Sequence, residues 1–445
     1  MTIGGPGAVT AKTAPAVPAM CRIRIGAIWR FLQTQPASFW CINFYLFIEY
    51  VRPQQVWEFL DILPYGELTI IATLIAMFLE GKLPNIRTIA GVALVAYSVV
   101  LVLSSFAAVS PSQAIKGWPL YFSWVLVYLM ITNIVTTEKR FFVFMLAFLL
   151  YSFKMSQHGF RTWMGNGFGF SDWGATGGPG WFHNSGEFGI QMCIFLPLSV
   201  EFILALRSNW GTFTRTFFYA MPVTAVASMI ASSSRGALLG GAAVAVWWVL
   251  RSKRRLRGLA AIALLGIATW AVVPPEQKAR FAVAGEDETS MSRITRWKAG
   301  IEMANQHPAF GIGYNNWITY YGPLSHNVFI QAWTELGYAG LIGFLGMIAA
   351  TMFVNARTRR IIARVPTSTP LIRHMAYGLD GALIGFLASG FFVTVLYYPF
   401  FWINLAMTVS LNAAARHARR EHVRLRQLEW AQARPCAGGV RPCYK

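Results

Sequence analysis

Long runs of apolar residues, separated by short polar segments, recur along the chain from about Phe39 to Leu411. A helix that crosses a bilayer needs about 20 mainly apolar residues, and runs of this kind are typical of such spans. We therefore predict an all-α, polytopic helical membrane protein. The first, eighth and last runs are short, which leaves a re-entrant path open for one or two of them. The twelve predicted spans are residues 37–51, 63–80, 88–108, 117–137, 140–157, 188–206, 216–232, 236–250, 258–274, 327–353, 377–396 and 399–412.

These spans divide the chain into five parts. Residues 1–36 form an N-terminal tail dominated at its start by Gly, Ala, Pro and Thr, a composition that predicts disorder. We expect no cleavable signal peptide there. Spans one to nine fill residues 37–274, and spans ten to twelve fill residues 326–412. Residues 275–325 form a loop between them, and residues 413–445 form a basic tail.

The net charge is +20, from 38 Lys and Arg residues against 18 Asp and Glu residues. Such a charge would suit nucleic acid, but its distribution indicates membrane topology instead. Of the 38 basic residues, 28 fall on the side of the predicted spans that carries both termini. Because cytoplasmic loops are enriched in Lys and Arg, we place both tails in the cytoplasm and the 275–325 loop on the outward face. We expect no nucleic-acid partner.

The chain carries no sequence pattern for a metal or nucleotide site. Its five cysteines lie in predicted spans or cytoplasmic tails, where thiols stay reduced. It has no His-x-x-x-His pair, no Asp-x-Asp pair and no Walker-type phosphate loop. We therefore predict no metal ion and no cofactor, which argues against an ATP-driven pump and a metal-dependent glycosyltransferase.

Ten basic residues face outward in this topology and need another explanation. An anionic substrate on that side would supply one, because the planar guanidinium of arginine donates two parallel hydrogen bonds to a phosphate group. These residues are Arg52, Lys116, Lys154, Arg161, Arg235, Lys278, Arg280, Arg293, Arg296 and Lys298.

Within the outward loop, residues Ser292 to Ala304 predict an amphipathic helix that lies on the membrane surface. Apolar residues stand at positions 294, 297, 301 and 304, which is helical spacing. Arg293 and Arg296 share one flank of that helix, and Lys298 follows them.

Arg235 and His326 stand at the outward ends of predicted spans, and each has two interpretations. Arg235 follows three serines, which leave room for a phosphate group, and we favour a phosphate-binding role for it over the alternative of a boundary arginine that snorkels to water. His326 precedes an apolar helix, whose dipole disfavours the imidazolium, so the neutral ring is poised to accept a proton. Its alternative is a helix-start residue bonded to a nearby carbonyl. Glu335, nine residues on, falls on nearly the opposite helix face, and we expect it to pack or cap.

Three stretches, in their order and spacing, resemble the O-antigen ligase and polymerase superfamily of bacterial inner-membrane glycan-transfer proteins. The resemblance covers residues 180–355 in detail. It implies about twelve helices, a periplasmic loop at 275–325, and transfer of a glycan from undecaprenyl pyrophosphate to a sugar hydroxyl. The three stretches are residues 232–237, residues 292–297 followed by 307–314, and Ser325-His326-Asn327 with Glu335, Gly337 and Gly340 behind it.

Carried over by position, the resemblance implies catalytic roles for Arg235, Arg293 and His326. The two arginines would hold the lipid pyrophosphate, and His326 would deprotonate the acceptor hydroxyl in a single, inverting displacement. Arg296 departs from the more usual apolar residue before the tryptophan, so either loop arginine could fill that role. The further candidates for substrate binding are Arg296, Lys298 and, in the outward segment 158–187, Arg161 and Asn184.

Within the superfamily three activities stay open. A ligase joins the glycan to lipid A–core, a polymerase joins repeat units, and a third kind modifies protein hydroxyls. The basic outward face favours the ligase, because lipid A–core is itself anionic. A transporter or flippase is a rival from another class, but the chain shows no repeat between its halves. The expected partners are the undecaprenyl pyrophosphate-linked glycan, lipid A–core and membrane lipids; the oligomeric state does not follow from the sequence.

Overall fold

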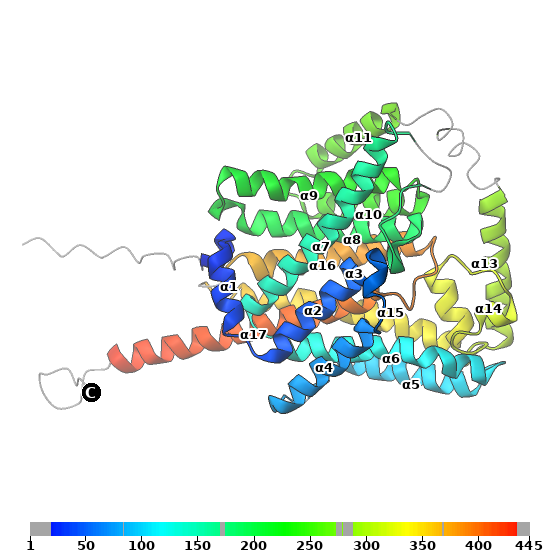
Figure 1. Ribbon diagram of the computed structural model, residues 1–445, viewed down its shortest axis with the longest axis horizontal. Helices are drawn as coiled ribbons and strands as arrows, with labels where there is room; N and C mark the ends of the chain where they lie inside the picture. Colours follow the sequence, from blue (N-terminus) through cyan, green and yellow to red (C-terminus); the bar gives the residue numbers. More distant parts are fainter. Residues whose placement is uncertain are drawn as a thin grey trace, which may run out of the picture.

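The computed structural model describes residues 19–82, 84–169, 174–272, 278, 288–366 and 369–433, and every regular element among them is a helix (Figure 1). The α-helices are α1 (Ile25–Gln33), α2 (Ala37–Val51), α3 (Pro53–Val56), α4 (Tyr65–Leu79), α5 (Ile89–Phe106), α6 (Pro111–Ile134), α7 (Glu138–Gly165), α8 (Ser185–Leu206), α9 (Thr212–Ala231), α10 (Arg235–Arg251), α11 (Arg255–Val272), α13 (Glu288–Gln306), α14 (Trp317–Tyr320), α15 (Val328–Ile362), α16 (Leu371–Gly390) and α17 (Pro399–Ala433). Short 3-10 turns lie at Ala19–Arg22, Glu58–Leu60, Gly180–Phe182 and Arg207–Asn209.

Each of the twelve predicted spans coincides with one helix: α2, α4 to α11, and α15 to α17. Five helices in the described part of the chain are long and apolar enough to cross a membrane, namely α5, α6, α7, α8 and α15. An all-α membrane protein is therefore confirmed. The full count of twelve crossings and the orientation stay predictions.

Four helices end well away from the predicted ends of their spans, and the first of them, α7, continues to Gly165 although its span was predicted to stop at 157. α15 and α17 continue to Ile362 and Ala433, whereas the predicted spans stop at 353 and 412. Hydropathy marks only the part of a helix suited to lipid, while backbone hydrogen bonding continues into the polar sequence. α16 ends at Gly390, although its span was predicted to reach 396, so residues 391–398 form a connection.

The helices form one bundle whose long helices run mostly along its longest axis, with α1 and the end of α17 at one end and α13 and α14 at the other (Figure 1). α8 lies at the centre, with 89% of its apolar window buried, and it packs against α16, α9 and α10. α15 packs against α5, α16 and α17.

Close approach between α10 and α16 depends on small residues, among them Gly236 and Gly240. A Cβ atom on Gly240 would lie 2.0 Å from the Ser389 hydroxyl oxygen. The same hydroxyl donates a hydrogen bond of 3.0 Å to the Gly236 carbonyl. Helix packing of this kind fixes the start of α10, and with it Arg235, against the end of α16.

α15 is broken near its start, and the preceding loop fills the break. Gly337 has φ 67° and ψ −165°, a conformation that side chains other than hydrogen disfavour. The break frees helix carbonyls, and that of Thr334 accepts the Ile312 N–H at 2.9 Å. A Cβ atom on Gly337 would lie 2.6 Å from the Ala309 carbonyl. The 307–314 stretch is thus an internal strap that binds the first turns of α15.

Glu335, on the same turn, has the packing role expected of it. Its side chain is 2% exposed, and one carboxylate oxygen accepts the Trp317 N–H at 3.3 Å. It thereby holds the loop that leads to His326.

Candidate functional site

α13 packs across the first turns of α15 and brings the loop arginines to one end of the bundle. Thr334 on α15 donates a hydrogen bond of 3.0 Å to the Gly300 carbonyl. Met303 and Ala304 are 5% and 0% exposed, whereas Ile301, which we had counted on the apolar face, is 37% exposed. The buried face of α13 is therefore rotated from the predicted one, because α13 packs against α15 and the strap and does not lie on lipid alone.

The backbone around His326 is held from both sides. Asn327 caps α15, and its side-chain oxygen accepts the N–H groups of Phe329 at 2.8 Å and Ile330 at 3.0 Å. His326 adopts a left-handed φ of 49°, and its N–H donates to the Thr394 hydroxyl at 2.7 Å. His326 thus lies one residue before the helix cap, and the turn holds its backbone in place.

α13 is tied to the residues just before His326. The Arg296 guanidinium donates to the Leu324 carbonyl at 3.1 Å. The Trp297 indole donates to the Ser325 carbonyl at 2.9 Å. Two consecutive side chains of α13 therefore fix the distance between that helix and the histidine.

Between α13 and this turn lies a pocket of about 240 Å³ lined by Glu288, Ser292, Arg293, Arg296 and His326. The structure thus brings together both loop arginines and the histidine, as their predicted roles require. Burial, together with the smaller effects of the positive charges of Arg293 and Arg296, lowers the pKa of the His326 imidazole to about 4. The ring is therefore neutral at neutral pH.

Arg235 approaches the same end of α13 without lining this pocket. It is the first residue of α10, where Ser234 caps the helix by accepting the Ala237 N–H. Its guanidinium donates to the Ser290 hydroxyl at 3.2 Å. Ser290 stands less than one turn before Ser292 and Arg293 on α13, so Arg235 extends the line of basic groups beyond the pocket.

The α16–α17 connection contacts the start of α10, α13 and the turn at His326, although the sequence pattern did not indicate a role for it. A Cβ atom on Gly236 would lie 3.1 Å from the Phe392 side chain, and the Trp297 and Phe391 rings lie 5.1 Å apart. Thr394 receives the His326 N–H. These residues belong to an apolar run that continues the preceding span, so nothing in the pattern distinguished them.

The other predicted substrate-binding residues lie outside the pocket. Lys298 is exposed on α13, and Arg161 is exposed on α7. Asn184 caps α8, and its side-chain oxygen accepts the Gly186 N–H at 2.9 Å. Conversely, Glu288 lines the pocket and was not predicted; only the acidic run that it ends could have indicated it.

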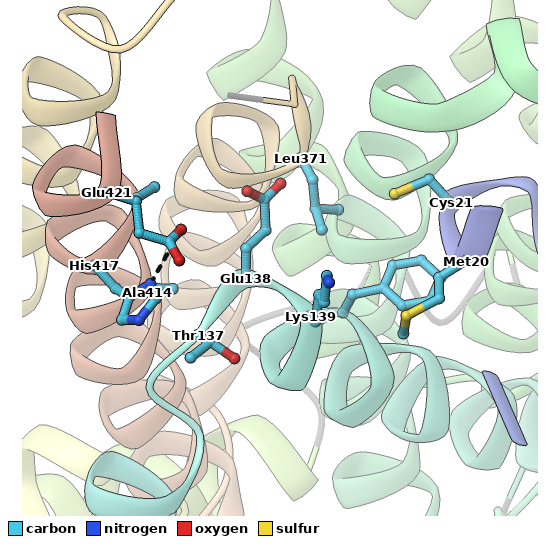
Figure 2. Close-up of a pocket in the computed structure, with 11 residues that line it drawn as sticks. Met20, Cys21, Thr137, Glu138, Lys139, Leu371, Ala414, His417 and Glu421 are labelled. Carbon is cyan, nitrogen blue, oxygen red and sulfur yellow. Dashed lines mark ion pairs between the residues drawn. The ribbon is translucent and has the colours of Figure 1, made fainter. Parts of the chain in front are cut away.

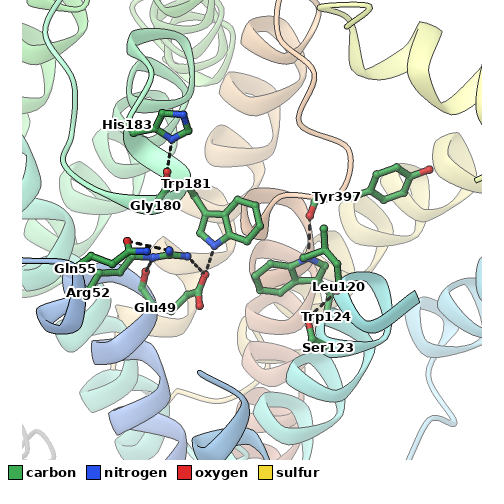
Figure 3. A network of polar contacts seen from close by, with 10 residues as sticks. All are labelled: Glu49, Arg52, Gln55, Leu120, Ser123, Trp124, Gly180, Trp181, His183 and Tyr397. Atoms are coloured by element: carbon green, nitrogen blue, oxygen red, sulfur yellow. Dashed lines mark hydrogen bonds and ion pairs between the residues drawn. The ribbon is translucent and has the colours of Figure 1, made fainter. Parts of the chain in front are cut away.

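A separate polar network explains one outward basic residue without a substrate (Figure 3). The Arg52 guanidinium pairs with the Glu49 carboxylate at 3.5 Å and lies over the Trp181 ring at 5.5 Å. The Trp181 indole also donates to Glu49, and the nearby Trp124 indole donates to the Tyr397 carbonyl at 2.9 Å. Arg52 therefore holds α2 against the loop before α8.

A further pocket, of about 260 Å³, contains none of the predicted site residues (Figure 2). It lies where the start of α7 meets α17, with Met20 and Cys21 on one side. Its rim holds an ion pair of 3.5 Å between His417 and Glu421. The pocket that contains Arg293, Arg296 and His326 lies instead at the α13 end of the bundle.

Taken together, these observations define an all-helical membrane protein with a basic, histidine-containing pocket at one end of its bundle. Residues 220–345 match the family described as O-antigen ligase. That range includes Arg235, Arg293 and His326. Over these residues, the resemblance to the O-antigen ligase and polymerase superfamily drawn from the motifs is confirmed.

No curated protein matches the chain. A solved structure that does match comes from work entitled "Structural coordination of polymerization and crosslinking by a peptidoglycan synthase complex". The two chains are 15% identical, the TM-score is 0.41, and the match covers 74% of this chain and 97% of the other.

Proposed function

We propose that the protein is an O-antigen ligase of the bacterial inner membrane. It would transfer a glycan from undecaprenyl pyrophosphate to a sugar hydroxyl of lipid A–core, with its pocket facing the periplasm. The observation that carries this proposal is the single pocket that contains His326 together with Arg293 and Arg296.

The arginines suit the donor. In the reaction, the bond between the anomeric carbon and the pyrophosphate oxygen breaks, and negative charge grows on the departing lipid pyrophosphate. Fixed positive charges at that position stabilise the transition state more than the ground state. Arg293 and Arg296 would bind this leaving group. Arg235, at the edge of the site, would bind the second phosphate group of the pyrophosphate or contact the glycan where it enters the site.

His326 suits the acceptor. The new bond joins the acceptor oxygen to the anomeric carbon, and the hydroxyl proton passes to the ring nitrogen. A base must be unprotonated to act, and burial with two neighbouring arginines keeps this imidazole neutral. A bound pyrophosphate offsets those positive charges, so donor binding would raise the pKa of His326 and make it a stronger base when both substrates are present. One displacement of this kind inverts the anomeric configuration.

The ligase is favoured over the polymerase and the protein glycosyltransferase by charge. The acceptor must approach a site surrounded by Arg235, Arg293, Arg296 and the exposed Lys298. Lipid A–core carries phosphate groups, whereas a protein hydroxyl or a neutral repeat unit offers less attraction.

The test uses a bacterial strain that lacks its own O-antigen ligase and makes a compatible lipid-linked glycan. The parent protein, His326→Ala and Arg235→Ala are expressed at matched membrane levels, together with Arg373→Gln as an exposed arginine near the start of α16. Lipopolysaccharide is then separated on a gel.

A ladder of capped lipopolysaccharide with the parent and Arg373→Gln, lost in the other two variants, is the expected result. Absence of capping by well-folded parent protein would contradict the ligase assignment, and new polymer on the lipid carrier or glycan on protein would identify the alternative activity. Capping that survives His326→Ala would remove the base from the mechanism.

A further inference from the structure

A third pocket, of about 220 Å³, is lined mainly by basic and apolar residues of α5, α15 and α17. Its basic residues are Arg87, Arg357 and Arg416. α15 begins beside His326, and Arg357 lies 29 residues after Val328. At about 1.5 Å per residue this places the pocket roughly 40 Å from the catalytic end, at the opposite boundary of the membrane part.

The three arginines have no carboxylate partner among the described residues of the chain. Arg416 donates to the Asn412 side chain at 2.8 Å, which orients its guanidinium without neutralising it. Burial lowers the pKa of Arg416, and the positive charge of Arg357 adds to that effect. The carboxylate of Asp380 on α16 pairs with a different arginine, Arg359, at 2.6 Å. Three guanidinium groups around one pocket, with no carboxylate among the residues that line it, create a positive potential that attracts an anion.

The pocket also contains the start of α5. Thr88 caps this helix by accepting the Gly91 N–H at 2.9 Å, and Thr88 and Ile89 line the pocket. Backbone N–H groups at a helix start lack partners within the helix and carry a partial positive charge. Together with three guanidinium groups they provide the donors that a phosphate group accepts.

The helices beside the pocket carry apolar stripes that identify the source of the phosphate. On α5, Ile89 and Val92 are 49% and 62% exposed, and the stripe continues along the helix through Val99. On α15, Phe353 is 49% exposed. A soluble phosphate ion has no apolar part that could bury these side chains, whereas the acyl chains of a phospholipid would cover them.

We propose that the pocket formed by Arg87, Arg357 and Arg416 binds the headgroup phosphate of an anionic phospholipid, whose acyl chains lie along the exposed stripes of α5 and α15. The lipid would join the cytoplasmic ends of α5, α15 and α17, three helices that otherwise meet there through like charges. This inference does not depend on the glycan-transfer activity.

The experiment is a native mass spectrometry titration of the purified, delipidated full chain in detergent. The ligands are phosphatidylglycerol, phosphatidylcholine and inorganic phosphate. The variants are Arg87→Gln with Arg357→Gln, both exposed, and a control pair, Arg254→Gln with Arg257→Gln, which removes the same charge from exposed positions at the start of α11. Thermal unfolding checks that both pairs fold.

We expect the parent to bind phosphatidylglycerol roughly 100-fold more tightly than phosphatidylcholine, because three arginines act on the anionic headgroup. The pocket variant should bind phosphatidylglycerol roughly 30-fold more weakly, since each arginine near an anionic headgroup contributes about fivefold, and the control pair should match the parent. Equal affinity of the parent for the two lipids overturns the proposal, and so does an equal loss in both variant pairs. Displacement of phosphatidylglycerol by millimolar inorganic phosphate would assign the pocket to a soluble anion instead.

Discussion

Replacing Arg293 by glutamine removes the positive charge with the larger effect of the two that disfavour protonation of His326. Burial is the largest cause of the low pKa of this histidine, followed by Arg293 and then Arg296. A positive neighbour disfavours the imidazolium, so its removal raises the pKa. We expect Arg293→Gln to move that pKa upward from about 4, yet not to the ordinary value of 6.5, because the burial remains.

The size of the effect can be followed in the pH dependence of kcat/KM, which reports the free enzyme. At pH 6 a histidine with a pKa of about 4 is roughly 1% protonated, and the parent should keep its activity down to about pH 5. An upward movement of about one pH unit in Arg293→Gln would shift the acid limb by the same amount. Arg296→Gln should move it less, in the same direction.

The absolute rates of both variants will fall, because the arginines also bind the donor; only the midpoint of the acid limb tests the electrostatic argument. Arg373→Gln, exposed near the start of α16, serves as the control and should leave the midpoint unchanged. A parent midpoint near 6.5, or a midpoint that neither arginine variant moves, would refute the reasoning.

Three further predictions concern the scaffold of the site. Gly337→Ala should lower the free energy of unfolding by about 2 kcal/mol or more, because Gly337 has a left-handed φ and an added Cβ would meet the strap. Gly346, on the same helix, has open space around it, so Gly346→Ala should be neutral or stabilising by up to about 1 kcal/mol. Thermal unfolding of the two variants tests this difference. Asn327→Ala should cost about 1 kcal/mol of stability by loss of the helix cap, and Asn327→Asp should restore it, as thermal unfolding of both would show. Trp297→Phe should leave the melting temperature within a few degrees of the parent but slow glycan transfer, because α13 loses one of its ties to the turn before His326; an unchanged initial rate would contradict this.

The helices could be predicted because each apolar run is a local property of the sequence. All twelve runs became helices, and their starts agree closely for α2, α5, α10 and α17. The helix ends agree less well, as in α16, because residues 391–398 contain no glycine, proline or charged residue to mark the end of the helix. These residues instead form the connection to α17, in which Phe391 packs against Trp297 and Thr394 accepts the His326 N–H.

The candidate site could be predicted only in part. The motif order placed Arg293, Arg296 and His326 at one end of the bundle, and the structure puts them in one pocket. Their proximity depends on the strap that returns the chain to the break at Gly337, and the contact of Thr394 with His326 joins residues 68 positions apart. No local pattern encodes such contacts.

The most direct test of the central claim is the initial rate of glycan transfer by purified protein supplied with an undecaprenyl pyrophosphate-linked glycan and lipid A–core. His326→Ala, shown to fold by its melting temperature, is compared with the parent, and the anomeric configuration of the product is determined by NMR. The account predicts an inverted product and a loss of roughly 10²- to 10⁴-fold in rate for the variant. A retained configuration, or a rate for His326→Ala close to that of the parent, would contradict it.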